Sequence, residues 1–152
     1  MTADDLPLIR RWIENPHVAE WWNDSADEFE FVSGDLDHPV MAQFIVTADA
    51  EPLGYLQCYN LGDWKDCFDP QPHGTRGLDQ FIGETGMIGR GHGSAFVGAF
   101  SKRLLVNGTP RVLVDPEPEN ARAIRAYEKA GFRRQNIVQT PDGPALLMVR
   151  DA

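Results

Sequence analysis

The sequence of 152 residues contains only two cysteines, Cys58 and Cys67. Two cysteines are too few for a disulfide framework, and their spacing is not that of a zinc site, so we expect two free thiols and no bound metal. The sequence also lacks an apolar run of about 18 residues, the length that a membrane-spanning helix needs. No basic-then-apolar leader precedes the first predicted helix, so we expect a cytoplasmic protein that does not contact membranes.

Basic residues are scarce. Lysine and arginine number 14 against 23 aspartates and glutamates, which gives a net charge of −9. This balance argues against binding to nucleic acid or to anionic lipid, and it suits a cationic partner. The acidic residues could equally serve solubility alone. The length and the ordinary hydrophobic content of 42% predict a single domain over residues 1–152.

Apolar periodicity and turn residues predict a mixed order of helices and strands. Proline, glycine and tryptophan mark the long polar segment 60–76, where Trp64 and Phe68 favour a binding wall over disorder. The predicted helices cover residues 2–15 and 25–36, a segment from the glycine-rich turn to about 106, and a segment after Pro118 that carries Tyr127. The predicted strands cover residues 43–47, 53–59, 79–83, 111–115, 137–140 and 145–150, and residues 50–52 join the first two of them.

The most informative stretch is the glycine-rich turn 87–93, Met-Ile-Gly-Arg-Gly-His-Gly, which lies between a predicted strand and a predicted helix. Glycine lets the backbone approach a ligand, and the first amides of a helix have no partner within it, so the turn favours binding of a phosphate or diphosphate. The Lys-Ser/Thr pair of an ATP-binding loop is missing, and the position of the turn does not fit a dinucleotide fold. A purely structural turn is the alternative.

A second motif, residues 120–132, has Asn120, Tyr127 and a final Gly131-Phe132 pair at the spacing seen in one superfamily. It resembles the closing motif of the GNAT superfamily of acetyl-CoA-dependent N-acetyltransferases. The turn 87–93 is similar to that superfamily's pyrophosphate loop, except that Gly86 stands where Gln or Arg is usual. The resemblance implies an α+β GNAT fold, with a mostly antiparallel central sheet splayed at its middle strands and helices on both faces. The usual first strand is expected to be missing.

The resemblance also implies acetyl-CoA as cosubstrate, without a metal. A backbone N–H near Phe81 or Ile82 would polarise the thioester carbonyl, and Tyr127 would protonate the leaving thiolate. Alternatively, Tyr127 only packs against Phe132 or Leu113. The residues assigned to the coenzyme by this resemblance are Gln80, Phe81, Ile82, Met87, Ile88, Gly89, Arg90, Gly91, His92, Gly93, Ser94, Asn120, Ala123, Tyr127 and Lys129.

Five segments carry a closer resemblance, namely residues 20–22, 77–83, 115–116, 123–132 and 140–145. They are similar to aminoglycoside 6′-N-acetyltransferases, which implies antibiotic resistance and a cationic aminoglycoside as substrate. Asp79 would then act as general base on the reacting amine. The residues that would hold or enclose the rest of the drug are Asp115, Asp142, Trp22, Asp63 and Trp64. Taken singly, each aspartate could be a helix or turn cap or a solvated charge.

The expected mechanism is direct transfer in a ternary complex, because one carboxylate can accept a proton from an amine held beside the thioester. Cys58 as a nucleophile is a weaker alternative, since no histidine or lysine is near it in the sequence. Other hypotheses are a GNAT enzyme for a siderophore, a lysine-containing metabolite or a peptide amine, and a non-catalytic acyl-CoA or polyamine sensor. The choice among aminoglycosides, acceptance of fluoroquinolones, and a monomer or a homodimer are left open.

Overall fold

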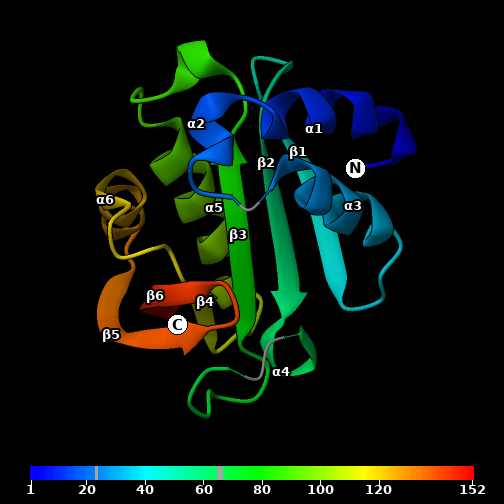
Figure 1. Cartoon of the computed structure of the whole chain (residues 1–152). Helices are drawn as coiled ribbons and strands as arrows, with labels where there is room; N and C mark the ends of the chain where they lie inside the picture. Colours follow the sequence, from blue (N-terminus) through cyan, green and yellow to red (C-terminus); the bar gives the residue numbers. More distant parts are fainter. Residues whose placement is uncertain (23, 65–66) are drawn as a thin grey trace. The chain divides into compact units, whose positions relative to one another are not determined.

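The computed structural model describes residues 1–22, 24–64 and 67–152, and it contains both helices and strands (Figure 1). The helical segments are η1 (Ala3–Asp5), α1 (Leu6–Ile13), α2 (Pro16–Ala19), α3 (Ser25–Gly34), α4 (Leu61–Trp64), η2 (Thr85–Met87), α5 (His92–Val106) and α6 (Ala121–Lys129). The strands are β1 (Met41–Ala48), β2 (Glu51–Asn60), β3 (Arg76–Ile82), β4 (Arg111–Val114), β5 (Arg133–Thr140) and β6 (Gly143–Asp151). The predicted mixture of helices and strands is confirmed.

The six strands hydrogen-bond in the order β1-β2-β3-β4-β6-β5. β3 runs parallel to β4, whereas β6 runs antiparallel to both β4 and β5. The described residues before Met41 form helices only, as expected for a fold without its usual first strand. None of the helices in the described ranges combines the length and the apolar character needed to span a bilayer.

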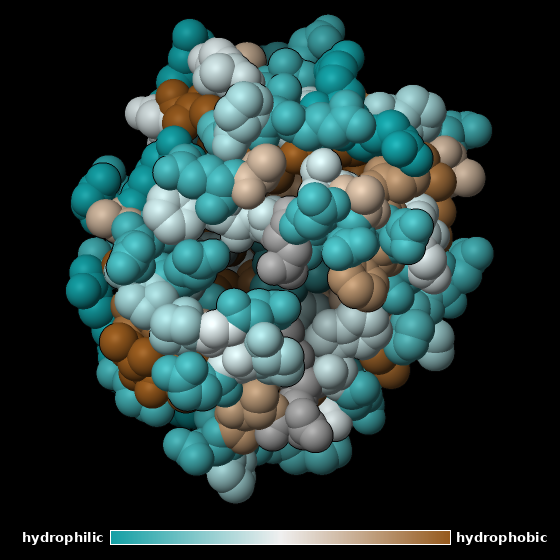
Figure 2. Space-filling view, in the orientation of Figure 1, coloured by the Kyte–Doolittle hydropathy of each residue, from teal (hydrophilic) through white to brown (hydrophobic). Residues whose placement is uncertain are grey.

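The chain divides into two compact units. The N-terminal unit comprises residues 1–58 and 80–92, and the C-terminal unit comprises residues 59–79 and 93–152. The division passes through β2 and β3, because each of these strands contributes residues to both units. A single domain over residues 1–152 therefore stays a prediction. On the face shown in Figure 2, hydrophilic side chains predominate and the apolar ones lie in small separate patches.

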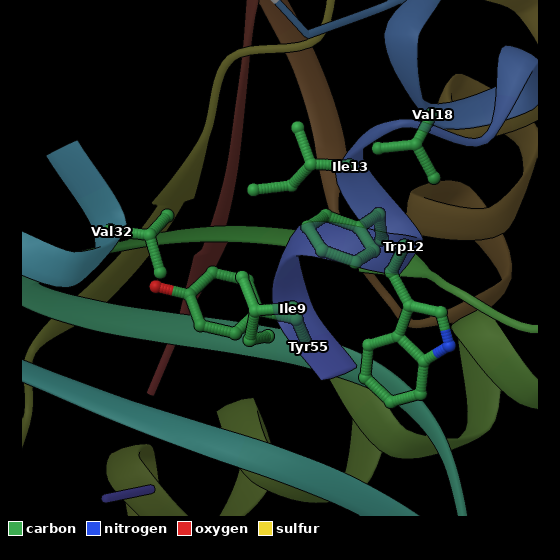
Figure 3. Packing of buried hydrophobic residues seen from close by; sticks show 7 residues of the cluster. Ile9, Trp12, Ile13, Val18, Val32 and Tyr55 are labelled. Carbon is green, nitrogen blue, oxygen red and sulfur yellow. The ribbon is translucent and has the colours of Figure 1, made fainter. Parts of the chain in front are cut away.

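The core of the N-terminal unit is built on one face of α1. Ile9, Trp12 and Ile13 are spaced three and four residues apart, so they share that face, and all three are fully buried (Figure 3). α1 packs against α3, which lies beside it in Figure 1. The ring of Phe81 lies edge-on to Trp12 at 6.3 Å and stacks on Tyr55 at 5.3 Å. These aromatic contacts fix the β2 and β3 segments of this unit against the helix.

The C-terminal unit is held together by the β5–β6 hairpin and by Arg150 on β6. The Arg150 Nη1 group donates to the carbonyl of Gly98 at 3.0 Å, to Ser101 Oγ at 2.8 Å and to the carbonyl of Ala130 at 2.8 Å. Because Ala130 is the C-cap of α6, the guanidinium serves a helix end, where cations are favoured. One side chain thus connects β6 with α5 and α6.

β5 begins four residues earlier than the prediction at residue 137. Its first residues, Arg133 to Asn136, are polar and exposed, so they show no apolar alternation. Pairing with β6 defines them instead, with an irregularity between Arg134 and Ile137. The loop predicted over residues 60–76 contains the single turn of α4, and α2 is likewise only four residues long. Such short helices are too brief to show a 3.6-residue period.

The predicted hairpin of β1 and β2 is confirmed, but its turn lies at Asp49 and Ala50 rather than around residues 50–52. Both residues have positive φ angles, 51° and 69°. Two central residues with positive φ match the twist of the flanking strands, and glycine or asparagine usually occupies such positions. Ala50 therefore holds a conformation that costs an L-residue about 1–2 kcal/mol.

We predict that Ala50→Gly stabilises the protein by about 0.5–1 kcal/mol, because relief of the positive φ exceeds the added entropy of the unfolded chain. Urea unfolding measures this change. Ala42→Gly in β1 is the matched control and should destabilise, since Ala42 is exposed in a regular strand. A loss of stability in Ala50→Gly would contradict the turn geometry.

Candidate active site

The buried hydroxyl of Tyr59, in the C-terminal unit, is where several predicted site residues meet. Tyr59 lies near the end of β2, is fully buried, and its hydroxyl donates to Asp79 Oδ1 at 3.4 Å. Burial raises the pKa of Tyr59 well above its usual range, and the negative charges of Asp79 and Asp115 add to this effect, as does Tyr127. Asp79, Asp115 and Tyr127 therefore all influence the ionisation of this one hydroxyl group.

The pairing of β3 with β4 explains why the two aspartates adjoin. The strands are parallel, and Gly77 is opposite Leu113. Asp79 and Asp115 each follow two residues later, which puts them at matching positions on the same side of the sheet. Asp115 comes directly after the last residue of β4, and both carboxylates are half-buried. The parallel pairing thus brings an acid from the middle of β3 to the same level as an acid at the end of β4.

Gly77 provides the space in which Tyr59 lies. A Cβ atom at this position would be 2.7 Å from the Tyr59 hydroxyl oxygen and closer still to two carbons of its ring. The ring therefore crosses β3 where no side chain stands. Asp79 is two residues further along the same face of the strand, so the hydroxyl reaches its carboxylate.

α4 follows directly after β2 and places Trp64 beside Tyr59, with 6.0 Å between the ring centroids. Asp63 is exposed, and its Oδ2 accepts a hydrogen bond from Asn60 Nδ2 at 3.2 Å. Trp64 thus packs beside Tyr59, whereas the hydrogen bond of Asp63 is to Asn60, the last residue of β2. Lys65 and Asp66, in the same predicted loop, lie outside the described residues.

α6 carries the second group of predicted residues. The Oδ1 atom of its N-cap, Asn120, accepts from the backbone N–H of Ala123 at 3.0 Å, so both residues fix the start of the helix. Tyr127 is buried, with its ring edge-on to Phe132 at 5.8 Å. Tyr127 therefore packs against Phe132, as the packing alternative predicts, and it also influences the pKa of Tyr59. Lys129 is exposed in the last turn.

Asp142 is not among the groups that act on Tyr59. It is exposed in the turn between β5 and β6, where its N–H donates to Thr140 Oγ1 at 3.2 Å. The backbone N–H of Leu146 donates to the carbonyl of Pro116 at 2.8 Å, so β6 continues past the end of β4. The turn consequently lies beyond the carboxyl end of β4, on the side of Asp115.

The glycine-rich turn has the backbone that its sequence predicts. Gly89 and Gly91 have φ angles of 75° and 85°, and α5 begins at His92, directly after them. A Cβ at either glycine would meet no atom within 4 Å, so glycine is needed there for conformation rather than for space. The predicted coenzyme residues Met87, Ile88 and Arg90 lie in this turn, and Gly93 and Ser94 form the first turn of α5.

Polar side chains that the sequence did not reveal hold the chain just before this turn. Within the N-terminal unit, Asn15 Nδ2 donates to the carbonyl of Gly83 at 2.9 Å, and His17 Nε2 lies 2.9 Å from the carbonyl of Ile82. Trp12 Nε1 donates to Glu84 Oε1 at 2.8 Å. Trp12 lies on the apolar face of α1, and Asn15 and His17 belong to the start of the four-residue helix α2, so no sequence pattern marked these polar contacts.

Trp22, a predicted wall of the substrate site, packs in the aromatic core of the N-terminal unit. Its ring is edge-on to Phe81 at 4.9 Å and to Tyr55 at 6.2 Å. Phe81 itself is buried, while its neighbours Gln80 and Ile82 are half-buried in β3. The side chain of Phe81 thus serves the core. The roles of these residues toward ligands stay predictions.

The raised pKa of Tyr59 predicts a loss of stability in alkali. An unfolded tyrosine ionises near pH 10, whereas the buried one stays protonated, so above that pH the unfolded state binds fewer protons and gains relative to the folded state. The contribution is fully present below about pH 10 and declines by about 1.4 kcal/mol per pH unit above it. Urea unfolding of the wild type and of Tyr59→Phe measures the difference. Parallel pH curves would contradict the prediction.

The sequence matches the family model described as "Acetyltransferase (GNAT) domain" over residues 1–140. It is 38% identical to the aminoglycoside N(6′)-acetyltransferase type 1 of Klebsiella pneumoniae, over 99% of this chain and 80% of that protein. It is also 46% identical to the kanamycin resistance protein of Rhizobium radiobacter, over 57% of this chain and 79% of that protein.

The fold is similar to the crystal structure of the aminoglycoside acetyltransferase AAC(6′)-Ib in complex with coenzyme A and kanamycin. The TM-score is 0.87 and the sequence identity 37%, with coverage of 99% of this chain and 91% of that one. The open six-stranded sheet with its helices is thus the predicted GNAT fold. On the family match over residues 1–140, the chain belongs to the GNAT family of acetyltransferases.

Proposed function

We propose that this chain transfers an acetyl group from acetyl-CoA to the 6′-amine of an aminoglycoside, by direct attack in a ternary complex. The observation that carries the proposal is the position of Asp79, which accepts from the buried hydroxyl of Tyr59 and lies level with Asp115 in the paired strands. Nearly full-length similarity to proteins named for aminoglycoside acetylation supports the substrate class. Acetyl-CoA is supplied in the cytoplasm, so we place the reaction there.

In the proposed reaction, the amine nitrogen attacks the thioester carbonyl carbon. A C–N bond forms, the C–S bond breaks, and the products are the N-acetylated drug and free coenzyme A. Asp79 accepts one proton from the nitrogen, because the amine is protonated in bulk water and cannot attack in that form. Tyr127 donates a proton to the departing sulfur. The nitrogen loses its second proton as the amide forms, and that proton restores Tyr127. Holding both reactants together contributes several kcal/mol more.

The glycine-rich turn and the start of α5 would hold the diphosphate of the coenzyme. The exposed backbone of Gly89 and Gly91 has no side chain above it, and the first N–H groups of a helix of 15 residues follow directly. Such groups bind anions without the help of a lysine. The missing Gln or Arg at Gly86 therefore leaves the proposed contacts in place.

Asp115 and Asp142 would hold other ammonium groups of the drug, with Asp63 and Trp64 around it. Each charge-assisted hydrogen bond of this kind contributes about 1.5–3 kcal/mol. Asp142 is exposed at the end of the hairpin, beyond the strand that leads to Asp115, so it suits a long cationic ligand better than a small one.

We predict that Asp79→Asn lowers kcat for kanamycin about 100-fold or more, because the amide cannot accept the proton. Release of coenzyme A is the measurement, with an aminoglycoside that has a hydroxyl group in place of the 6′-amine as a negative substrate. Asp37→Asn is the matched control, since this exposed aspartate lies outside the proposed site. Wild-type protein that binds acetyl-CoA but releases no coenzyme A with any aminoglycoside would overturn the proposed function.

A double variant, Asp115→Asn with Asp142→Asn, separates this function from its alternatives. We predict a rise of about 10-fold or more in KM for kanamycin, because ammonium groups lose charged partners, and little change in KM for acetyl-CoA. Steady-state kinetics with both substrates tests this. An unchanged KM for kanamycin would instead favour a siderophore, a lysine-containing metabolite or a peptide amine, which carry fewer cations.

A further inference from the structure

Tyr59 has no part in the chemistry above, yet its hydroxyl is the group on which Asp79, Asp115 and Tyr127 all act. We propose that Tyr59 is the positioning residue of the catalytic base: its hydroxyl donates to Asp79 Oδ1 and holds that carboxylate in the orientation that receives the amine proton. The inference rests on the proposed function, because the role of Asp79 does so.

The surroundings of Tyr59 give its hydroxyl a fixed place. The side chain is fully buried, it lies where Gly77 has no Cβ, and the ring of Trp64 is 6.0 Å away. The hydroxyl oxygen of Tyr59 cannot move away from Asp79 unless the whole ring leaves its position over Gly77. A rigid donor of this kind is what a catalytic group needs from its support.

The hydrogen bond can run in one direction only. Burial and the neighbouring negative charges raise the pKa of Tyr59, so its hydroxyl keeps its proton wherever the enzyme would work. An ionised carboxylate can only accept. Before the proton transfer, when Asp79 is the base, Tyr59 therefore donates and Asp79 accepts, which fixes one oxygen of a side chain whose terminal torsion is otherwise broad.

The length of the bond indicates where its effect would appear. At 3.4 Å it is longer than the 2.5–2.7 Å of a strong hydroxyl–carboxylate bond. Catalytic hydrogen bonds are often long without substrate and shorten when the reacting complex forms. Removal of the hydroxyl should therefore change the rate of reaction more than it changes folding.

The decisive variant is Tyr59→Phe, which removes only the hydroxyl and keeps the ring over Gly77. We expect kcat for kanamycin to fall about 10- to 100-fold, while KM for acetyl-CoA and the melting temperature stay close to wild type. Tyr55→Phe is the matched control. It removes the hydroxyl of another fully buried tyrosine of β2, one that donates to Gln57 Oε1 at 2.7 Å, and should leave kcat unchanged.

A double-mutant cycle shows whether the hydroxyl acts through Asp79. In an Asp79→Asn background, Tyr59→Phe should cause no further loss of kcat, because the carboxylate that it positions is gone. Gly77→Ala is the second variant: it should lower kcat at least as far by displacing the ring, although Tyr59 and Asp79 are both retained. Losses that multiply in the cycle, or an unchanged kcat in Tyr59→Phe, would overturn the inference.

The four proteins of the double-mutant cycle also separate this inference from the proposed function. Their unfolding constants in urea should show a coupling of a few-fold between Tyr59 and Asp79, whatever substrate the enzyme takes. If the wild type acetylates no aminoglycoside, the proposed function fails while the coupling is still measured. If the coupling is absent, Tyr59 does not hold Asp79 and the inference fails by itself.

Discussion

The absence of a side chain at Gly77 is the constraint on which the acidic site depends. It lets the ring of Tyr59 cross β3, and the crossing ring is fully buried. A buried hydroxyl costs free energy unless it has a partner, and the carboxylate two residues further along the strand supplies one. The packing of the ring and the electrostatics of the site therefore have the same cause. The space at Gly77 buries the ring of Tyr59 and places its hydroxyl next to Asp79.

The same register brings two acidic side chains to matching positions. Asp79 lies within β3 and Asp115 directly after the parallel strand β4, and both raise the pKa of the Tyr59 hydroxyl. Both carboxylates are half-buried, so they keep part of their surface open to a ligand. A ligand with several ammonium groups would pair with both carboxylates, which is the preference that the proposed substrate class requires.

The sequence was sufficient for the parts of the fold that local patterns define. The face formed by Ile9, Trp12 and Ile13 was visible as a helical stripe, and the hairpins were visible from alternation and turn residues. β5 started earlier than predicted because its first residues are polar and exposed, and only pairing with β6 makes them a strand. The missing information was the pairing of these polar residues with the other strand of the hairpin.

The site shows the same limit. Asp79 was predicted at the start of its strand but lies in the middle of β3, whereas Asp115 does follow the end of β4. Their matching positions follow from the parallel pairing of these strands, which no local pattern predicts. Tyr59 was missed because β2 is buried along most of its length, which does not show which residue lies against the ring of Tyr59. The nearest signal was Gly77 in β3, since a glycine inside a strand often marks the close approach of another group.

Glycine has two different physical functions in this chain, and the sequence alone does not distinguish them. At Gly77 and Gly83 a Cβ would collide with an aromatic ring, Tyr59 in one case and Trp12 in the other, so these positions require space. At Gly89 and Gly91 the space is open, and the positive φ angles require glycine instead. A motif search finds the second kind, because it clusters before a helix, and passes over the first. The acidic site depends on Gly77, which is a glycine of the first kind. Its contact with Tyr59 could therefore be found only from the packing of the structure.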